Sequence, residues 1–135
     1  MNRTVVLNSE EDTIKLAQEI SGKLTGNEVI ALYGELGAGK TFFAQALCTF
    51  LDVTEYVSSP SYVIINEYEG KFHISHLDLY RLKNEEEVLE LGLEEVFENG
   101  ITIIEWPESA EQMLPDNTKR FYFVPDKEQR TVTII

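Results

Sequence analysis

The sequence is poor in cysteine, in basic residues and in long apolar segments. Its single cysteine, Cys48, excludes an intrachain disulfide and a zinc site built from cysteines. Only 11 lysines and arginines stand against 24 aspartates and glutamates, which gives a formal net charge of -13. Because a surface this acidic repels a nucleic-acid backbone, we do not expect the chain to bind tRNA or DNA unaided.

We also expect no segment that exports or anchors the chain. The N-terminus lacks the apolar core and the small-residue cleavage site of a signal peptide, and no apolar run approaches the ~20 residues that a membrane span needs. The chain has no linker-like tract and no internal repeat, and its 135 residues, 43% of them hydrophobic, suffice for one buried core. We therefore expect a single cytoplasmic domain over residues 1–135.

The apolar patterns that are present indicate an α/β fold. Residues 29–33 and 101–104 are continuous apolar runs, which predict two parallel strands covered on both faces. A helix over residues 41–51 begins the crossover that such a pair requires. Antiparallel strands should complete the sheet. The other predicted elements are a strand at 4–7, a helix capped by Ser9, a hairpin of residues 62–69 and 71–77, an acidic helical region at 84–99 broken near Gly92, and closing strands at 119–124 and 130–135.

A glycine-rich loop with the spacing Gly-x4-Gly-Lys-Thr follows the first apolar strand. Its glycines allow successive backbone N–H groups to point at an anion, and the N-terminus of the next helix adds positive potential. The lysine would supply a cation to the β and γ phosphates, and the threonine hydroxyl would ligate Mg2+. The pattern predicts a P-loop NTPase-like domain with a mixed sheet flanked by helices, in which ATP phosphates and Mg2+ are held by Gly34, Glu35, Leu36, Gly37, Ala38, Gly39, Lys40 and Thr41.

Two acidic residues are candidates for the metal and for catalysis. Glu105 follows the second apolar run, where the acid of a Walker B strand stands, so a parallel strand would bring its carboxylate near Mg2+. Asp78 shares a strand face with His76. It could ligate metal through water, orient the attacking water or hold a loop, and the residues alone leave these roles open. We interpret His76 as structural, because one histidine beside one aspartate is no metal site.

Three further segments follow the loop in a characteristic order. They read Ser-Pro-Ser-Tyr at residues 59–62, His-Leu-Asp-Leu-Tyr-Arg at 76–81 and Glu-Trp-Pro at 105–107. Together with the P-loop, they resemble the TsaE (YjeE) family of bacterial tRNA threonylcarbamoyladenosine biosynthesis proteins, over roughly residues 9–107. The family usually has Ser-Pro-Thr-Phe at the first segment. Here Ser61 retains the hydroxyl and Tyr62 retains the ring.

The resemblance implies an ATPase that is weak alone and works with the TsaD–TsaB pair. Those partners attach a threonylcarbamoyl group to the adenosine beside the tRNA anticodon, so tRNA would be held through them. In this interpretation Lys40, Asp78 and Glu105 are catalytic, and Thr41 and Glu105 bind the metal. The resemblance also places Thr13 by the nucleotide base, and Ser61 and Trp106 at the border of the site.

Three other functions remain as alternatives. A small-molecule or nucleotide kinase usually needs a lid and several arginines to clamp its second substrate, whereas this chain has only four scattered arginines. A GTPase would read guanine with an Asn-Lys-x-Asp segment, which is missing. An interaction module that holds ATP as a structural ligand is compatible with everything in the sequence.

Overall fold

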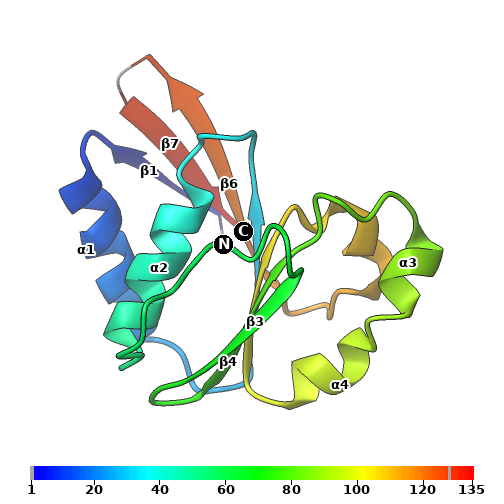
Figure 1. Ribbon diagram of the computed structural model, residues 1–135. Coiled ribbons are helices and arrows are strands. Elements are labelled where there is room, and N and C mark those ends of the chain that lie inside the picture. The colour runs from blue at the N-terminus through cyan, green and yellow to red at the C-terminus, as the bar shows by residue number, and fades with distance from the viewer. Residues whose placement is uncertain (1, 128) are drawn as a thin grey trace.

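A seven-stranded sheet with helices on both faces forms the centre of the protein (Figure 1). This computed structural model describes residues 2–127 and 129–135. The strands lie in the order β1-β7-β6-β2-β5-β4-β3. In chain order the elements are β1 (Arg3–Leu7), α1 (Glu10–Ser21), β2 (Val29–Tyr33), α2 (Lys40–Phe50), β3 (Ile65–Glu69), β4 (His73–Asp78), α3 (Glu85–Leu89), α4 (Leu93–Glu98), β5 (Ile101–Glu105), the 3-10 helix η1 (Pro107–Met113), β6 (Lys119–Asp126) and β7 (Gln129–Ile134).

The parallel part of the sheet is larger than the sequence indicated. Strands β6, β2, β5 and β4 all run parallel, while β3, β7 and β1 are antiparallel to their neighbours. The mixed α/β sheet and its predicted parallel pair, β2 and β5, are confirmed, but β4 and β6 also run parallel, where antiparallel additions were expected. Both segments were predicted as strands, but not as parallel ones, because polar residues such as His76 and Arg120 interrupt the apolar run that marks a buried parallel strand.

Each face of the sheet has its own hydrophobic core. Helices α1 and α2 cover one face, where Phe43 and Leu47 of α2 pack with Ile103 of β5. Helices α3, α4 and η1 cover the other face, where Val88 packs with Ile104. Since successive strand residues point to opposite faces, Glu105 shares the α2 face with Ile103. This alternation directs the carboxylate toward the helix that follows the glycine loop.

Local signals at the other predicted elements were mostly confirmed. The Ser9 hydroxyl caps α1 by accepting from the Asp12 N–H at 3.3 Å, and Gly92, with a φ of 67°, separates α3 from α4. The hairpin is present, but β3 begins at Ile65 rather than at residue 62. The chain turns first, because the Ile64 N–H donates to the Pro60 carbonyl at 2.7 Å and Ile64 has a φ of 73°.

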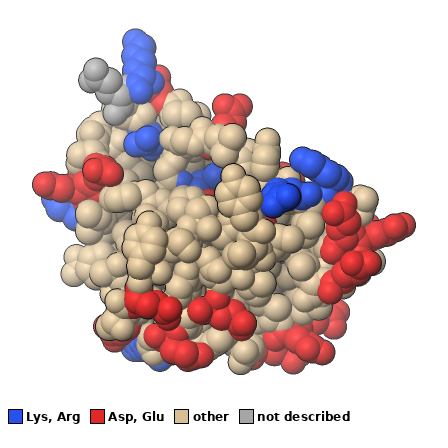
Figure 2. Space-filling view, in the orientation of Figure 1, with Lys and Arg blue, Asp and Glu red and all other residues tan. Residues whose placement is uncertain are grey.

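Acidic side chains gather over α3 and α4. Figure 2 shows red side chains along the lower and right margins of the view, with a mostly uncharged centre. Residues 85–98 contain seven glutamates and no lysine or arginine. These helices therefore form a negative, solvated flank of the molecule. Within residues 2–127 and 129–135, no helix combines the length and apolar character that crossing a membrane requires.

Cys48 is fully buried in α2, and burial raises the pKa of its thiol from 9.0 to about 12. We expect the folded protein to resist alkylation by iodoacetamide at mildly alkaline pH, with labelling appearing as denaturant unfolds it. The folded thiol binds its proton more tightly than the unfolded one, so its contribution to stability is lost as pH rises from the unfolded pKa toward about 12. Mass spectrometry of alkylated samples checks the prediction, and rapid labelling of the native protein would contradict it.

The carboxyl ends of the four parallel strands lie along one edge of the sheet, where open α/β sheets bind their ligands. Strand β1 also ends there, because Leu7 pairs with Arg130 at the start of β7. The glycine loop, Trp106 and the N-terminus of α1 all follow strands that end at this edge.

Candidate functional site

The glycine loop connects β2 to α2 in a conformation that depends on its glycines. Gly34, Gly37 and Gly39 have φ values of 144°, 81° and 100°. A Cβ on Gly34 would also lie 2.7 Å from the Phe123 carbonyl oxygen, which is too close for any side chain. These positions let the backbone turn tightly and reach the first residue of α2, Lys40. The loop therefore has the strand–turn–helix setting that phosphate binding requires.

A cavity of about 290 Å3 opens beside this loop. Its lining brings together most of the predicted site residues from four separate parts of the chain: loop residues 36–41 with Phe42, then Ser59 and Ser61, then Asp78, then Glu105 and Trp106. Gly34, which follows the last residue of β2, and the exposed Glu35 do not line it. The cavity has both the backbone and the side-chain groups of a phosphate site.

Lys40 is buried inside this cavity. Its ammonium donates to the Gly34 carbonyl and lies 3.5 Å from the centroid of the Trp106 ring. Burial lowers the pKa of Lys40, and the negative charges of Glu105, Glu108 and Asp78 oppose that shift. Trp106 has a left-handed φ of 55°, a conformation that is costly for a residue with a large side chain. That backbone turn directs the indole over the lysine.

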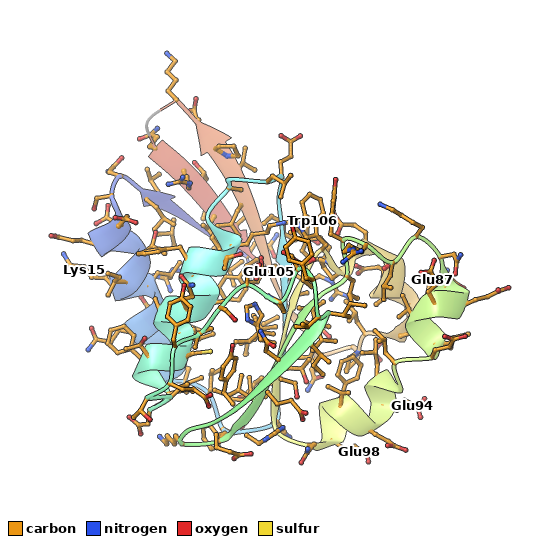
Figure 3. The ribbon with its side chains drawn as sticks, in the orientation of Figure 1. Lys15, Glu87, Glu94, Glu98, Glu105 and Trp106 are labelled. Carbon is orange, nitrogen blue, oxygen red and sulfur yellow. The ribbon has the colours of Figure 1, made fainter. Side chains whose placement is uncertain are left out.

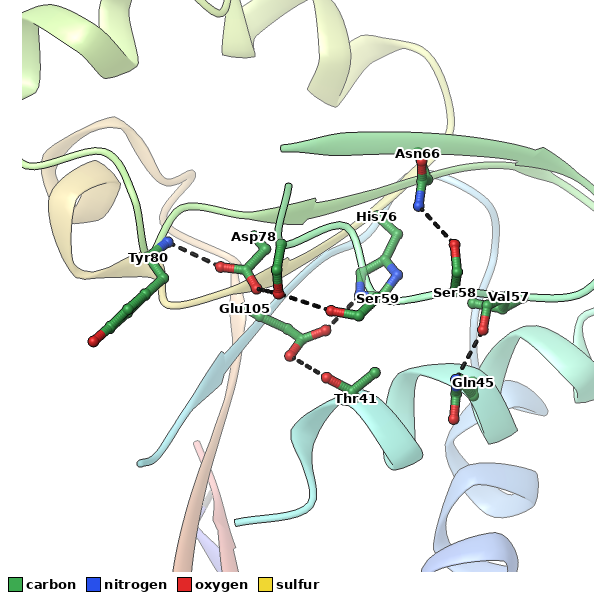
Figure 4. A network of polar contacts seen from close by, with 11 residues as sticks. Thr41, Gln45, Val57, Ser58, Ser59, Asn66, His76, Asp78, Tyr80 and Glu105 are labelled. Atoms are coloured by element: carbon green, nitrogen blue, oxygen red, sulfur yellow. Dashed lines mark hydrogen bonds and ion pairs between the residues drawn. The ribbon is translucent and has the colours of Figure 1, made fainter. Parts of the chain in front are cut away.

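Glu105 lies at the centre of a polar network (Figure 4). Its Oε1 accepts a hydrogen bond from the Thr41 hydroxyl at 2.7 Å, and its Oε2 lies 2.7 Å from His76 Nε2. The carboxylate is 2% exposed. Figure 3 shows Glu105 and Trp106 at the middle of the molecule, whereas Glu87, Glu94 and Glu98 extend outward from α3 and α4. Glu105 and Thr41, the two predicted metal ligands, therefore contact each other directly.

Asp78 pairs with Glu105 across the β4–β5 ladder. Its Oδ1 accepts from the Tyr80 N–H and its Oδ2 from the Ser61 hydroxyl, both at 2.9 Å. The Ser61 and Ser59 hydroxyls are in turn 2.8 Å apart. Of the three roles that the sequence left open for Asp78, the structure displays the holding of a loop, because both carboxylate oxygens bind groups on flanking segments.

Comparison of this sequence with known protein families and proteins identifies the family of the chain. A family model described as "Threonylcarbamoyl adenosine biosynthesis protein TsaE" matches residues 7–132. The chain belongs to the TsaE family. It is 40% identical over 117 residues to the tRNA threonylcarbamoyladenosine biosynthesis protein TsaE of Rickettsia bellii, covering 85% of this chain and 81% of that protein. It is 46% identical over 109 residues to the protein of the same name from Aquifex aeolicus, covering 78% and 77%.

A solved structure shares the fold of this TsaE protein. The crystal structure of YdiB from Bacillus subtilis superposes with a TM-score of 0.83 at 28% identity, covering 99% of this chain and 84% of that one. The likeness extends over nearly the whole chain, including the C-terminal hairpin of β6 and β7, beyond the region in which sequence motifs suggested TsaE.

Two further residues of this TsaE protein, Thr13 and Arg130, stand outside the lining of this cavity. Thr13 is buried in α1 and does not line the cavity beside the loop. Arg130, which sequence analysis left among scattered arginines, donates from Nη2 to the Gly37 carbonyl at 3.2 Å and extends beside Gly39. No sequence signal marks Arg130, because it reaches the loop only through the pairing of β7 with β6.

The donor set at the centre of the site fits Mg2+. The Thr41 hydroxyl and the Glu105 carboxylate are oxygen ligands, which Mg2+ prefers. In the part of the chain that the structure describes, no group of three or more His, Cys, Asp and Glu side chains is arranged to hold a metal by itself. Such a sparse protein contribution is typical of Mg2+ sites that share the ion with substrate phosphates and water.

Proposed function

We propose that this protein binds and hydrolyses ATP with Mg2+, and that it is required for threonylcarbamoyladenosine modification of tRNA together with the TsaD–TsaB complex. The observation that carries the proposal is the hydrogen bond between Thr41 of the P-loop and Glu105 of β5, inside a cavity that also contains Lys40. Membership of the TsaE family supports a role in tRNA threonylcarbamoyladenosine biosynthesis, the pathway that the names of the related proteins state. The residues that line the cavity support the binding and hydrolysis of ATP.

The loop and Lys40 would bind the phosphates. Backbone N–H groups of the loop and the N-terminus of α2 favour an anion at this position. Burial has already removed much of the water around the Lys40 ammonium, as its lowered pKa reflects. An anionic phosphate would therefore interact with it more strongly than in bulk water, and would replace the Gly34 carbonyl as its partner.

Thr41 and Glu105 would hold Mg2+, Glu105 directly or through a bound water. When bound, the ion neutralises charge on the β and γ phosphates. The Thr41 hydroxyl, which now donates to Glu105, would turn its oxygen toward the metal. Hydrolysis would proceed by in-line attack of water on the γ phosphate, with Lys40 stabilising the charge that develops on the phosphate oxygens.

Asp78 would couple hydrolysis to the segment at residues 58–64. Its contact with Ser61 ties this segment to the same cavity wall that carries Glu105. Many P-loop proteins place a segment that responds to the γ phosphate after the P-loop helix. The side chains of Tyr62 and Val63 in this segment are 86% and 60% exposed. A partner that contacts them would therefore respond to the nucleotide bound in the site. We assign Asp78 to this coupling, with orientation of the attacking water as the alternative role.

The nucleoside would extend from the loop toward the N-terminus of α1. A second cavity, of about 610 Å3, lies there between Asn8 and the β6–β7 hairpin, where Asp126, Lys127 and Gln129 line it. Arg130, on the same hairpin, contacts the glycine loop by donating a hydrogen bond to the Gly37 carbonyl. Polar side chains suited to a purine and a ribose surround this space, with Thr13 one turn into α1. Trp106 borders the opposite, phosphate end of the site.

The acidic surface supports an indirect relation to tRNA. With 24 acids against 11 bases, the protein would bind tRNA only through TsaD and TsaB, and it would act in the cytoplasm. Its negative flank over α3 and α4 suits partners with basic surfaces (Figure 2).

The proposal is tested by the ATP turnover rate of the pure protein, measured alone and then with TsaD and TsaB. We expect a low rate alone and a rise of about tenfold or more with the partners, equivalent to about 1.4 kcal/mol of transition-state stabilisation. Inorganic phosphate should be the product, since phosphate transfer to a small acceptor would instead indicate a kinase. Binding of ATP without any response to the partners would remove the proposed role in tRNA modification.

A further inference from the structure

His76 is a fully buried side chain with one hydrogen-bond partner among the described residues. Its Nε2 lies 2.7 Å from Glu105 Oε2, while its Nδ1 is buried without a hydrogen-bond partner among the described residues. A buried imidazole that served only to tie the core together would be expected to use both nitrogens, because an unpaired buried polar atom is costly. The environment of His76 is therefore organised around its contact with Glu105.

The contact completes a clamp on the Glu105 carboxylate (Figure 4). Oε2 faces His76 on the neighbouring parallel strand, where His76 pairs with Ile103, two residues before Glu105. Oε1 faces the Thr41 hydroxyl at the first turn of α2. Because a carboxylate oxygen only accepts, the Nε2–H of His76 is the donor of the first bond. Oε2 is thus held by a residue of the sheet, and Oε1 accepts from Thr41 of the P-loop.

Glu105 and the oppositely charged Lys40 each contact other groups in this cavity. Both side chains line the same cavity, and their opposite charges attract. A freely rotating carboxylate could move toward the ammonium and neutralise the charge that phosphates need. In the structure Lys40 instead contacts the Gly34 carbonyl and the Trp106 ring, and Glu105 contacts His76 and Thr41.

We propose that His76 is a positioning residue for Glu105, which holds Oε2 so that Oε1 stays directed at Thr41 and at the position where a divalent cation would bind. The inference rests on the proposed function, because it concerns how Glu105 is presented to Mg2+ and nucleotide. His76 itself contacts neither phosphate nor metal. Partners that orient a metal ligand in this way commonly contribute 10- to 100-fold to metal affinity or activity.

A pair of substitutions separates the hydrogen bond from the shape of the side chain. The amide of His76→Gln can place an N–H near the position of Nε2, whereas that of His76→Asn reaches only the region of Nδ1. We would measure ADP affinity by calorimetry in EDTA and at increasing Mg2+, and ATP turnover at saturating Mg2+. The melting temperature of each variant without nucleotide reports folding.

We expect His76→Asn to raise the Mg2+ concentration needed for tight ADP binding about tenfold, and to lower turnover 10- to 100-fold. Affinity in EDTA should remain within about threefold of the natural protein, because Glu105 does not touch the phosphates without metal. His76→Gln should recover most of the Mg2+ response. That combination would support positioning through the hydrogen bond.

Two results would overturn the inference. One is an equal Mg2+ response in His76→Gln and His76→Asn, which would make the Nε2 donor irrelevant. The other is a loss of ADP affinity in EDTA as large as the loss in Mg2+, which would indicate damage to the phosphate loop. If the natural protein itself bound ADP with no response to Mg2+, the proposed function would fail, and this outcome is recognised before any variant is compared.

Discussion

Replacing Lys40 with alanine is expected to abolish measurable nucleotide binding. Lys40 is the cation at the first turn of α2, and its ammonium is buried in the cavity beside the loop. Removing one partner of a buried, charge-assisted contact costs about 2–5 kcal/mol, so affinity for ATP or ADP should fall by a factor between about 30 and several thousand. Calorimetric titration with ADP and Mg2+ measures the loss directly.

The folded state should tolerate this substitution. Burial lowers the pKa of Lys40, which means that the ammonium is held at a cost when no anion is present. The melting temperature of Lys40→Ala without nucleotide should therefore match or exceed that of the natural protein. A matched control is Lys71→Ala, in the exposed β3–β4 turn beside Phe72, which should bind ADP normally. Unchanged ADP affinity in Lys40→Ala would remove the assignment of the phosphate site.

Replacing Glu105 with glutamine is expected to reduce turnover far more than binding. Glutamine retains the shape of the side chain, and its oxygen can still accept from the Thr41 hydroxyl. Its NH2 can donate to His76 Nε2 once the imidazole carries its proton on Nδ1, but the amide lacks the charge that attracts Mg2+. We expect turnover to fall about 100-fold, whereas ATP affinity at saturating Mg2+ should change by no more than about threefold. Steady-state kinetics combined with direct binding of a slowly hydrolysed ATP analogue separates the two quantities.

Glutamine is a sharper substitution than alanine at this position. Alanine would leave the buried His76 Nε2 and the Thr41 hydroxyl without their partner, so a lower stability could imitate a loss of activity. Glu94→Gln, at an exposed site of α4, is the control for removing one negative charge from an acidic protein. Equal losses of turnover and affinity in Glu105→Gln would make Glu105 a binding residue rather than a catalytic one.

The residues of the candidate site that belong to a short, contiguous pattern could be predicted from the sequence. The P-loop needs only eight successive residues, because the strand, the turn and the helix that use them are formed locally. Glu105 was predictable for a similar reason, since an acid at the end of an apolar parallel strand must lie at the carboxyl edge of the sheet. Residues without such a local context were harder to interpret: Arg130 gave no signal, and His76 was interpreted as structural because nothing in the sequence placed it beside Glu105.

Long-range pairing decides what these other residues contact. His76 and Glu105 are 29 positions apart, Thr41 and Glu105 are 64 apart, and Arg130 is 93 positions from Gly37. Each contact requires a particular strand to lie beside another. Strand order depends on how all the apolar faces pack at once, which no local pattern records.

The sequence by itself therefore determined the P-loop, the acid at the end of β5, the capped first helix, the break between α3 and α4, and the family to which the chain belongs. Only the tertiary structure decided that β4 and β6 extend the parallel core. It also decided that His76 and Thr41 bind different oxygens of the Glu105 carboxylate, and that Arg130 contacts the glycine loop. The physical reason is that turns and helix ends are stabilised by neighbours along the chain, whereas a buried polar network depends on which strands the packed cores bring side by side.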